Sequence, residues 1–133
     1  MQLNIPGVVV DGTSPITATP ARSDIVVYQG QDTVIQVTIT GSTGVATNIT
    51  GWSGTLTVKD RLLPNQGTPA VVKTYTATLT SPSSGVMQFS IPGSDLKALQ
   101  LISYWWDVFV TNAGKRDEVV PTGLMTVNVA VGA

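Results

Sequence analysis

The stretch ISYWWDVFV, residues 102–110, places two tryptophans side by side with a carboxylate directly after them. Neighbouring side chains of a strand point to opposite faces of its sheet. The even-numbered residues are the more apolar, so we expect them in a core: Ile102, Tyr104, Trp106, Val108 and Val110. The odd-numbered residues then face outward: Ser103, Trp105, Asp107, Phe109 and Thr111.

Trp105 and Phe109 are therefore two large aromatic residues on an outer face, about 13 Å apart along the strand, with Asp107 between them. Three roles fit such a pair: a platform on which sugars stack, a contact with another subunit, or a surface covered by another segment of the same chain. We favour the subunit contact.

The sequence has few groups that do acid–base or metal chemistry. It has no His and no Cys, which removes the commonest general base, the commonest metal ligand and any disulfide. It has no glycine-rich phosphate loop and no His-Glu-x-x-His motif. Its acidic residues are scattered, mostly in turn-like stretches where carboxylates cap backbone groups. We therefore expect no enzymatic activity and predict no catalytic residue, cofactor-binding residue or metal site.

The charge of the chain limits its partners. Seven basic and eight acidic residues give a net charge of −1, which argues against binding to nucleic acid. Charged residues make up 11% of the chain, well below the usual quarter or so, and such a surface suits a protein packed into an assembly. No apolar run reaches the roughly 18 residues of a membrane span, so we expect no membrane partner.

Residues 1–23 differ from the remainder of the chain. They contain three prolines and little periodicity, which predicts an extended N-terminal arm in front of a domain at 24–133. The arm is either a frayed end or a segment that lies on a neighbouring subunit. In the second case its apolar residues are interface anchors, which with Trp105 and Phe109 completes the predicted partner interface: Ile5, Val8, Val9 and Val10.

After Ser23 the apolar residues recur with a period of two, and turn-forming clusters separate the runs. This pattern predicts an antiparallel two-sheet, immunoglobulin-like β-sandwich. One segment breaks the period and predicts a short helix at 93–99, with Ser94 as its N-cap. A kink or a break is expected where Pro121, Thr122 and Gly123 interrupt the last run. The predicted strands are 24–30, 33–40, 52–60, 70–80, 86–91, 102–111 and 116–131.

The order of these motifs resembles small immunoglobulin-like β-sandwich domains of tailed-bacteriophage virion proteins, such as the N-terminal domain of baseplate upper proteins. The resemblance covers about residues 24–131, and Trp52 departs from it by standing where a smaller residue is usual. It is carried by four stretches: DIVVYQGQDTVIQVTIT, TNITGWSGTLTVKD, SGVMQFSIPGSDLKAL and YWWDVFVTNAGKRDEVVPTGLMTVNVAV.

The resemblance implies a structural protein of a virion, present in the host cytoplasm during assembly. Its partners would be the major capsid protein or other virion subunits, including further copies of itself. A single sandwich with an N-terminal arm favours a head decoration or cement protein. A tail, baseplate or fibre-adaptor component is the alternative, and a carbohydrate-binding module is the second alternative.

Overall fold

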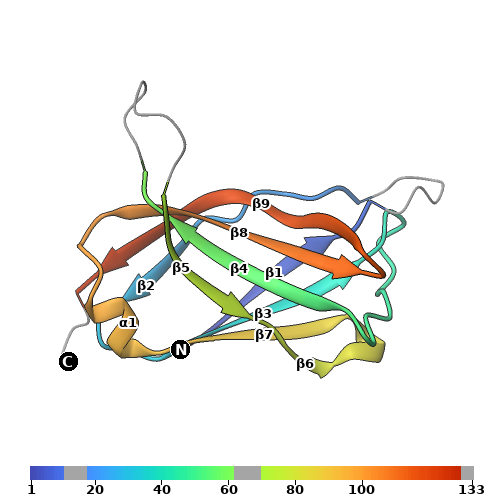
Figure 1. Ribbon diagram of the computed structural model, residues 1–133, viewed down its shortest axis with the longest axis horizontal. Helices are drawn as coiled ribbons and strands as arrows, with labels where there is room; N and C mark the ends of the chain where they lie inside the picture. The colour runs from blue at the N-terminus through green and yellow to red at the C-terminus, as the bar shows by residue number, and fades with distance from the viewer. Residues whose placement is uncertain (11–17, 62–69, 130–133) are drawn as a thin grey trace.

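The computed structural model describes residues 1–10, 18–61 and 70–129, which form two β-sheets packed face to face (Figure 1). The two-sheet, all-β architecture confirms the predicted fold class. In the four-stranded sheet the order is β1 (Gln2–Val8), β3 (Thr33–Thr40), β7 (Val86–Ile91) and β6 (Thr78–Ser81). In the five-stranded sheet it is β2 (Ile25–Tyr28), β9 (Lys115–Asn128), β8 (Ser103–Asn112), β4 (Ser53–Lys59) and β5 (Val71–Thr76).

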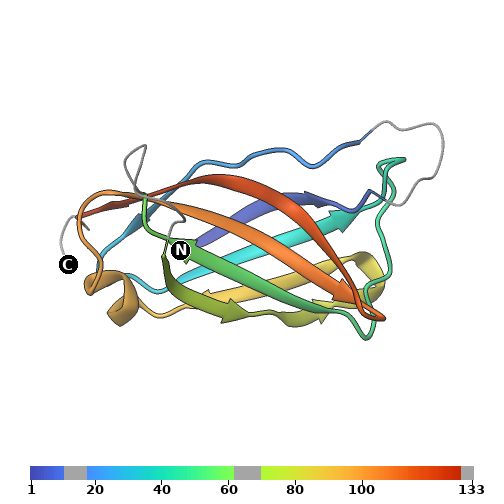
Figure 2. The same ribbon diagram turned by 45° about the horizontal axis from the view of Figure 1, so that its top comes forward.

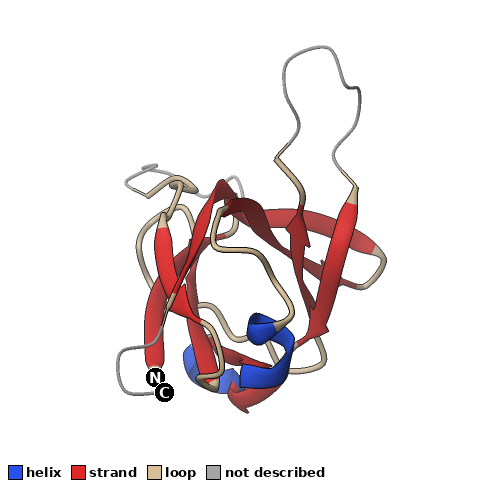
Figure 3. Cartoon of the chain, turned by 90° about the vertical axis from the view of Figure 1, so that its left-hand side faces the viewer, coloured by secondary structure: helices blue, strands red, loops and turns tan. Residues whose placement is uncertain are grey.

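The core lies between the two sheets and is built by the period-two alternation of their strands. In β3 and β7 the inward residues are fully buried, and they are β-branched, aromatic or otherwise apolar. Trp106 of β8 is also fully buried, as predicted. The short helix α1 (Gly93–Lys97) lies at one end of the sandwich, where Leu96 is buried against the core (Figure 3). A 3-10 turn, η1 (Pro82–Ser84), joins β6 to β7.

The N-terminal residues correct the predicted arm. β1 is an edge strand that pairs in parallel with β3, so that Ile5 lies opposite Val37. Ile5, Val8 and Val9 are buried within this chain, and only Val10 of the four predicted anchors is exposed. The sequence pattern does not predict this strand, because Pro6 is unfavourable in the interior of a sheet. An edge strand such as β1 tolerates a proline. Residues 11–17 of the predicted arm lie outside the described residues.

The predicted strand at 70–80 is wrong, because it divides between the two sheets. β5 belongs to the five-stranded sheet and β6 to the four-stranded sheet. Between them, the backbone N–H of Ala77 donates to the carbonyl of Gly54 over 2.9 Å. The alternation of side chains continues through this crossing, so the sequence pattern gives no sign of it. Val71, at the start of β5, is 57% exposed.

Two smaller expectations near α1 and β8 also need correction. Ile102 precedes β8 and is 47% exposed, so it does not belong to the core face. Ser94 is not the N-cap of α1, since the cap position is Pro92 and no side-chain hydrogen bond caps the helix.

The interruption at residues 121–123 is a change of register within a continuous β9. Trp106 pairs with Gly123 and Phe109 pairs with Glu118, so three steps along β8 correspond to five along β9. The two extra residues of β9 are accommodated in two β-bulges, one opposite the step from Trp106 to Val108 and the other opposite the step from Val108 to Phe109. The predicted irregularity is therefore present as a local bulge in the centre of the five-stranded sheet.

Candidate interaction surface

The outer face of the five-stranded sheet carries the residues that the sequence singled out. Trp105, Asp107 and Phe109, which we call the aromatic row, lie on β8 in the middle of this sheet. The register of β4 places one residue beside each of them: Lys59 beside Trp105, Thr57 beside Asp107 and Thr55 beside Phe109. Trp105 and Phe109 are each partly buried although they face away from the core.

Arginine side chains cover both rings of the aromatic row. The guanidinium carbons of Arg22 and Arg61 lie 5.9 and 5.3 Å from the ring centroid of Trp105. That of Arg116 lies 3.8 Å from the ring centroid of Phe109. These are cation–π distances, and they account for part of the cover on the rings. Of the three roles predicted for these aromatics, cover by the same chain is the one for which the structure provides contacts.

Asp107 is the buried charge at the centre of the row. It is 3% exposed, its Oδ2 lies 3.7 Å from Nζ of Lys59, and its Oδ1 is buried without a hydrogen-bond partner. Desolvation raises the pKa of Asp107, and the charges of Lys59 and Arg116 partly oppose this. Desolvation also raises the pKa of Glu118, with the charge of Asp107 as the next cause. Ionising both carboxylates on this face is therefore unfavourable.

A short segment ahead of β2 links the two faces of the sheet. The carbonyl of Ser23 accepts a hydrogen bond from Nε1 of the core residue Trp106 at 2.9 Å. Asp24 accepts one from the backbone N–H of Leu124, also at 2.9 Å. Arg22 pairs with Asp24 at 2.8 Å while it covers Trp105, and this hydrogen bond lowers the pKa of Asp24. Figure 2 shows the segment running beside β9.

The predicted interface residues do not form a single site. Trp105 and Phe109 lie on the outer face of the five-stranded sheet, whereas Ile5 and Val8 belong to β1 in the other sheet. The sequence pattern does not indicate the covering arginines. They come from three distant parts of the chain, and only the folded structure brings them to the same face.

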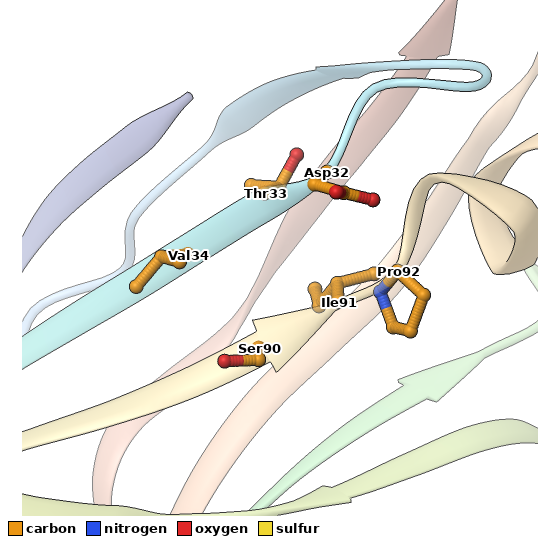
Figure 4. Close-up of a pocket in the computed structure, with 6 residues that line it drawn as sticks. All are labelled: Asp32, Thr33, Val34, Ser90, Ile91 and Pro92. Atoms are coloured by element: carbon orange, nitrogen blue, oxygen red, sulfur yellow. The ribbon is translucent and has the colours of Figure 1, made fainter.

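One hollow among the described residues lies away from the outer face. The hollow drawn in Figure 4, of about 330 Å³, is open and lined by residues of β3, β7 and the turns beside them. Its carboxylate, Asp32, accepts a hydrogen bond from the backbone N–H of Gly93 at 2.7 Å. Within residues 1–10, 18–61 and 70–129, no three acidic, histidine or cysteine residues cluster as metal ligands. No helix in these ranges is long and apolar enough to span a membrane.

Comparison with known proteins identifies a shared fold. No family model matches the sequence, and no curated protein matches it. Among solved structures, the N-terminal domain of phage TP901-1 ORF48 is similar, with a TM-score of 0.54 and 11% identity over 96% of this chain and 98% of that one. A DUF4784 family protein from Bacteroides caccae has a TM-score of 0.47 and 12% identity, and 23% of its length is covered. The chain thus shares, nearly end to end, the sandwich fold of a domain from a phage protein.

Proposed function

We propose that this chain is a non-enzymatic structural component of a tailed-bacteriophage virion. The observation that carries the proposal is the match of fold over nearly the full length of both this chain and the phage ORF48 domain. The resemblance of residues 24–131 to virion sandwich domains supports it independently, since it was drawn from sequence motifs. The low fraction of charged residues is also typical of a protein that is packed into an assembly.

Within the virion, we favour the tail or baseplate over the head. The prediction of a head decoration protein depended on an N-terminal arm that ties capsomers together. Residues 2–9 are instead part of the sandwich, with Ile5 and Val9 in its core, so this support is lost. The virion sandwich domains that the sequence resembles include the N-terminal domain of baseplate upper proteins, and the similar structure is also an N-terminal domain of a phage protein.

A carbohydrate-binding module is less well supported by the geometry of the outer face. Sugar stacking needs an accessible aromatic ring. Guanidinium groups lie over the rings of Trp105 and Phe109, so a sugar would have to displace Arg61 or Arg116 before it could stack.

The proposal is tested by mass spectrometry of purified virions of the phage that encodes the chain, after heads and tails have been separated on a gradient. We expect peptides of this protein in the tail fraction, at a fixed ratio to known tail subunits. Peptides confined to the head fraction would support a virion role but overturn the tail assignment. Absence from both fractions would contradict the proposed function altogether.

A further inference from the structure

Two of the arginines on the outer face have guanidinium groups that form no ion pair with a described carboxylate. Among the described residues, Arg22 pairs with Asp24, whereas Arg61 and Arg116 form no ion pair within 4.0 Å. Both are exposed. Each lies over an aromatic ring of the row, Arg61 over Trp105 and Arg116 over Phe109.

Stacking on a ring prepares a guanidinium group to bind an acid. Where a ring contacts the flat face of the group, the N–H donors around its edge remain available for a bidentate bond to a carboxylate. The contact also restricts the long arginine side chain, which reduces the entropy lost when a ligand binds. Arg61 and Arg116 therefore present oriented donors at the two ends of the aromatic row.

The acidic groups of the same face do not occupy these donors. Asp107 is buried beside Lys59, and Asp24 is bound to Arg22. Glu118 lies in the electric field of Arg116 without forming an ion pair with it. Asp60, next to Arg61 in the chain, also forms no ion pair among the described residues. Arg61 and Arg116 thus keep donors at the two ends of the row that no described carboxylate occupies.

We propose that the outer face of the five-stranded sheet binds an acidic, extended segment of a partner protein, with Arg61 and Arg116 each receiving one carboxylate. Trp105 and Phe109 are four residues apart on β8, which corresponds to about 13 Å. An extended partner segment with acidic residues at positions i and i+4 has the same spacing. Its intervening side chains would lie along the row. The proposal goes beyond the virion role and does not depend on it.

The test is an NMR titration of the purified full chain with short peptides at 50 mM salt, following the Trp105 indole and the amides of β4 and β8. The probe has glutamate at its first and fifth positions with Thr-Val-Thr between them. One control peptide replaces both glutamates by glutamine, and another places them next to each other. We expect the first peptide to bind most tightly and its binding to weaken severalfold at 0.5 M salt.

Variants identify the residues responsible. Arg61→Gln and Arg116→Gln should each weaken binding about fivefold, which corresponds to an exposed ion pair of roughly 1 kcal/mol. Lys97→Gln, which removes a cation from α1, should leave binding unchanged. Melting temperatures equal to that of the parent show that the variants fold.

Three outcomes would overturn the proposal. The first is equal binding of the glutamine peptide, and the second is an equal loss in Lys97→Gln and in the arginine variants. The third is binding of a poly(glycerol phosphate) chain at 0.15 M salt where the glutamate peptide shows none, since the face would then select phosphate polymers and not acidic protein segments.

Discussion

The indole N–H of Trp106 donates a hydrogen bond of 2.9 Å to the carbonyl of Ser23, which lies 83 residues earlier in the chain. Trp106 pairs across the sheet with Gly123, and a Cβ atom at Gly123 would lie only 2.1 Å from the same Ser23 carbonyl. The missing side chain of Gly123 thus makes room for the segment that holds the tryptophan in place.

This arrangement predicts different costs for the two adjacent tryptophans. Trp106→Ala should lower the free energy of unfolding by about 3–5 kcal/mol, because it empties a large volume in the core. Trp106→Phe should cost about 1–3 kcal/mol, because it leaves the Ser23 carbonyl without its donor. Urea denaturation followed by circular dichroism measures both. Trp105→Ala is the matched control, and an equal loss there would contradict the placement of the two rings.

The N-terminal strand should contribute to stability as a core element does. Ile5→Ala should lower the free energy of unfolding by about 2–4 kcal/mol, because Ile5 is buried beside Val37 in this chain. Val10→Ala should change it by less than about 0.5 kcal/mol, since Val10 is 51% exposed. Thermal and urea unfolding of the isolated protein provide the comparison. Equal, small effects at both positions would contradict the core position of Ile5 and support the predicted extended N-terminal arm.

Asp107 should make stability depend on pH. Its pKa is raised in the folded state, so the folded protein holds this proton more tightly than the unfolded chain does. The free energy of unfolding must then fall as pH rises from the ordinary aspartate range through the raised value. Asp107→Asn removes this dependence and should stabilise the protein by about 1 kcal/mol at pH 8, because a buried charge is lost while the partly exposed Lys59 can reach water.

The measurement is urea unfolding of both proteins between pH 3 and pH 8. The stability of Asp107→Asn relative to the parent should increase with pH. Asp24, whose pKa is lowered, is present in both proteins and cancels in the difference. Glu118 adds to the difference in the same direction, because the charge of Asp107 contributes to its raised pKa and the variant lacks that charge. Asp60→Asn serves as the control. A difference between parent and Asp107→Asn that is constant with pH would show that the ionisation of Asp107 is not coupled to folding.

The attachment of α1 should depend on Asp95 and not on Ser94. The hydroxyl of Tyr75 donates to Asp95 at 3.0 Å, and Nζ of Lys73 lies 3.8 Å from the same carboxylate, so Asp95 links α1 to β5. Desolvation and this hydrogen bond raise the pKa of Tyr75. Asp95→Ala should therefore cost about 1–2 kcal/mol, and Ser94→Ala less than about 0.5 kcal/mol, in urea unfolding. The reverse order would mean that Ser94 caps the helix after all.

Much of the sandwich could be predicted from the sequence because its strands alternate between core and solvent. β3 and β7 were predicted with their observed bounds, and the opposite faces of Trp105 and Trp106 follow from the same period. Alternation does not report which sheet a strand belongs to, so the division of 70–80 at Ala77 was missed. An edge strand that contains Pro6 and pairs in parallel has no comparable pattern, so the sequence of β1 predicts an arm instead.

The outer face was predictable only in part. The alternation placed Trp105 and Phe109 outside the core, but it could not show what covers them. Arg22, Arg61 and Arg116 reach the aromatic row through tertiary contacts between segments far apart in sequence. The burial of the Asp107 carboxylate is likewise a property of the packed sheet. The arginine cover and the burial of Asp107 depend on tertiary contacts, which the local periodicity of the sequence does not indicate.

We propose that this chain is a virion component, and combining this role with the binding of a partner at the outer face of the five-stranded sheet, we expect that face to be covered in the virion. Hydroxyl-radical footprinting tests it most directly, by comparing oxidation of Trp105 in the purified protein and in intact virions that contain it. Met1, exposed beside β1 of the other sheet, provides the internal reference. We predict that oxidation of Trp105 relative to Met1 falls severalfold in the virion. An unchanged ratio would mean that no neighbour covers the outer face of the five-stranded sheet in the virion.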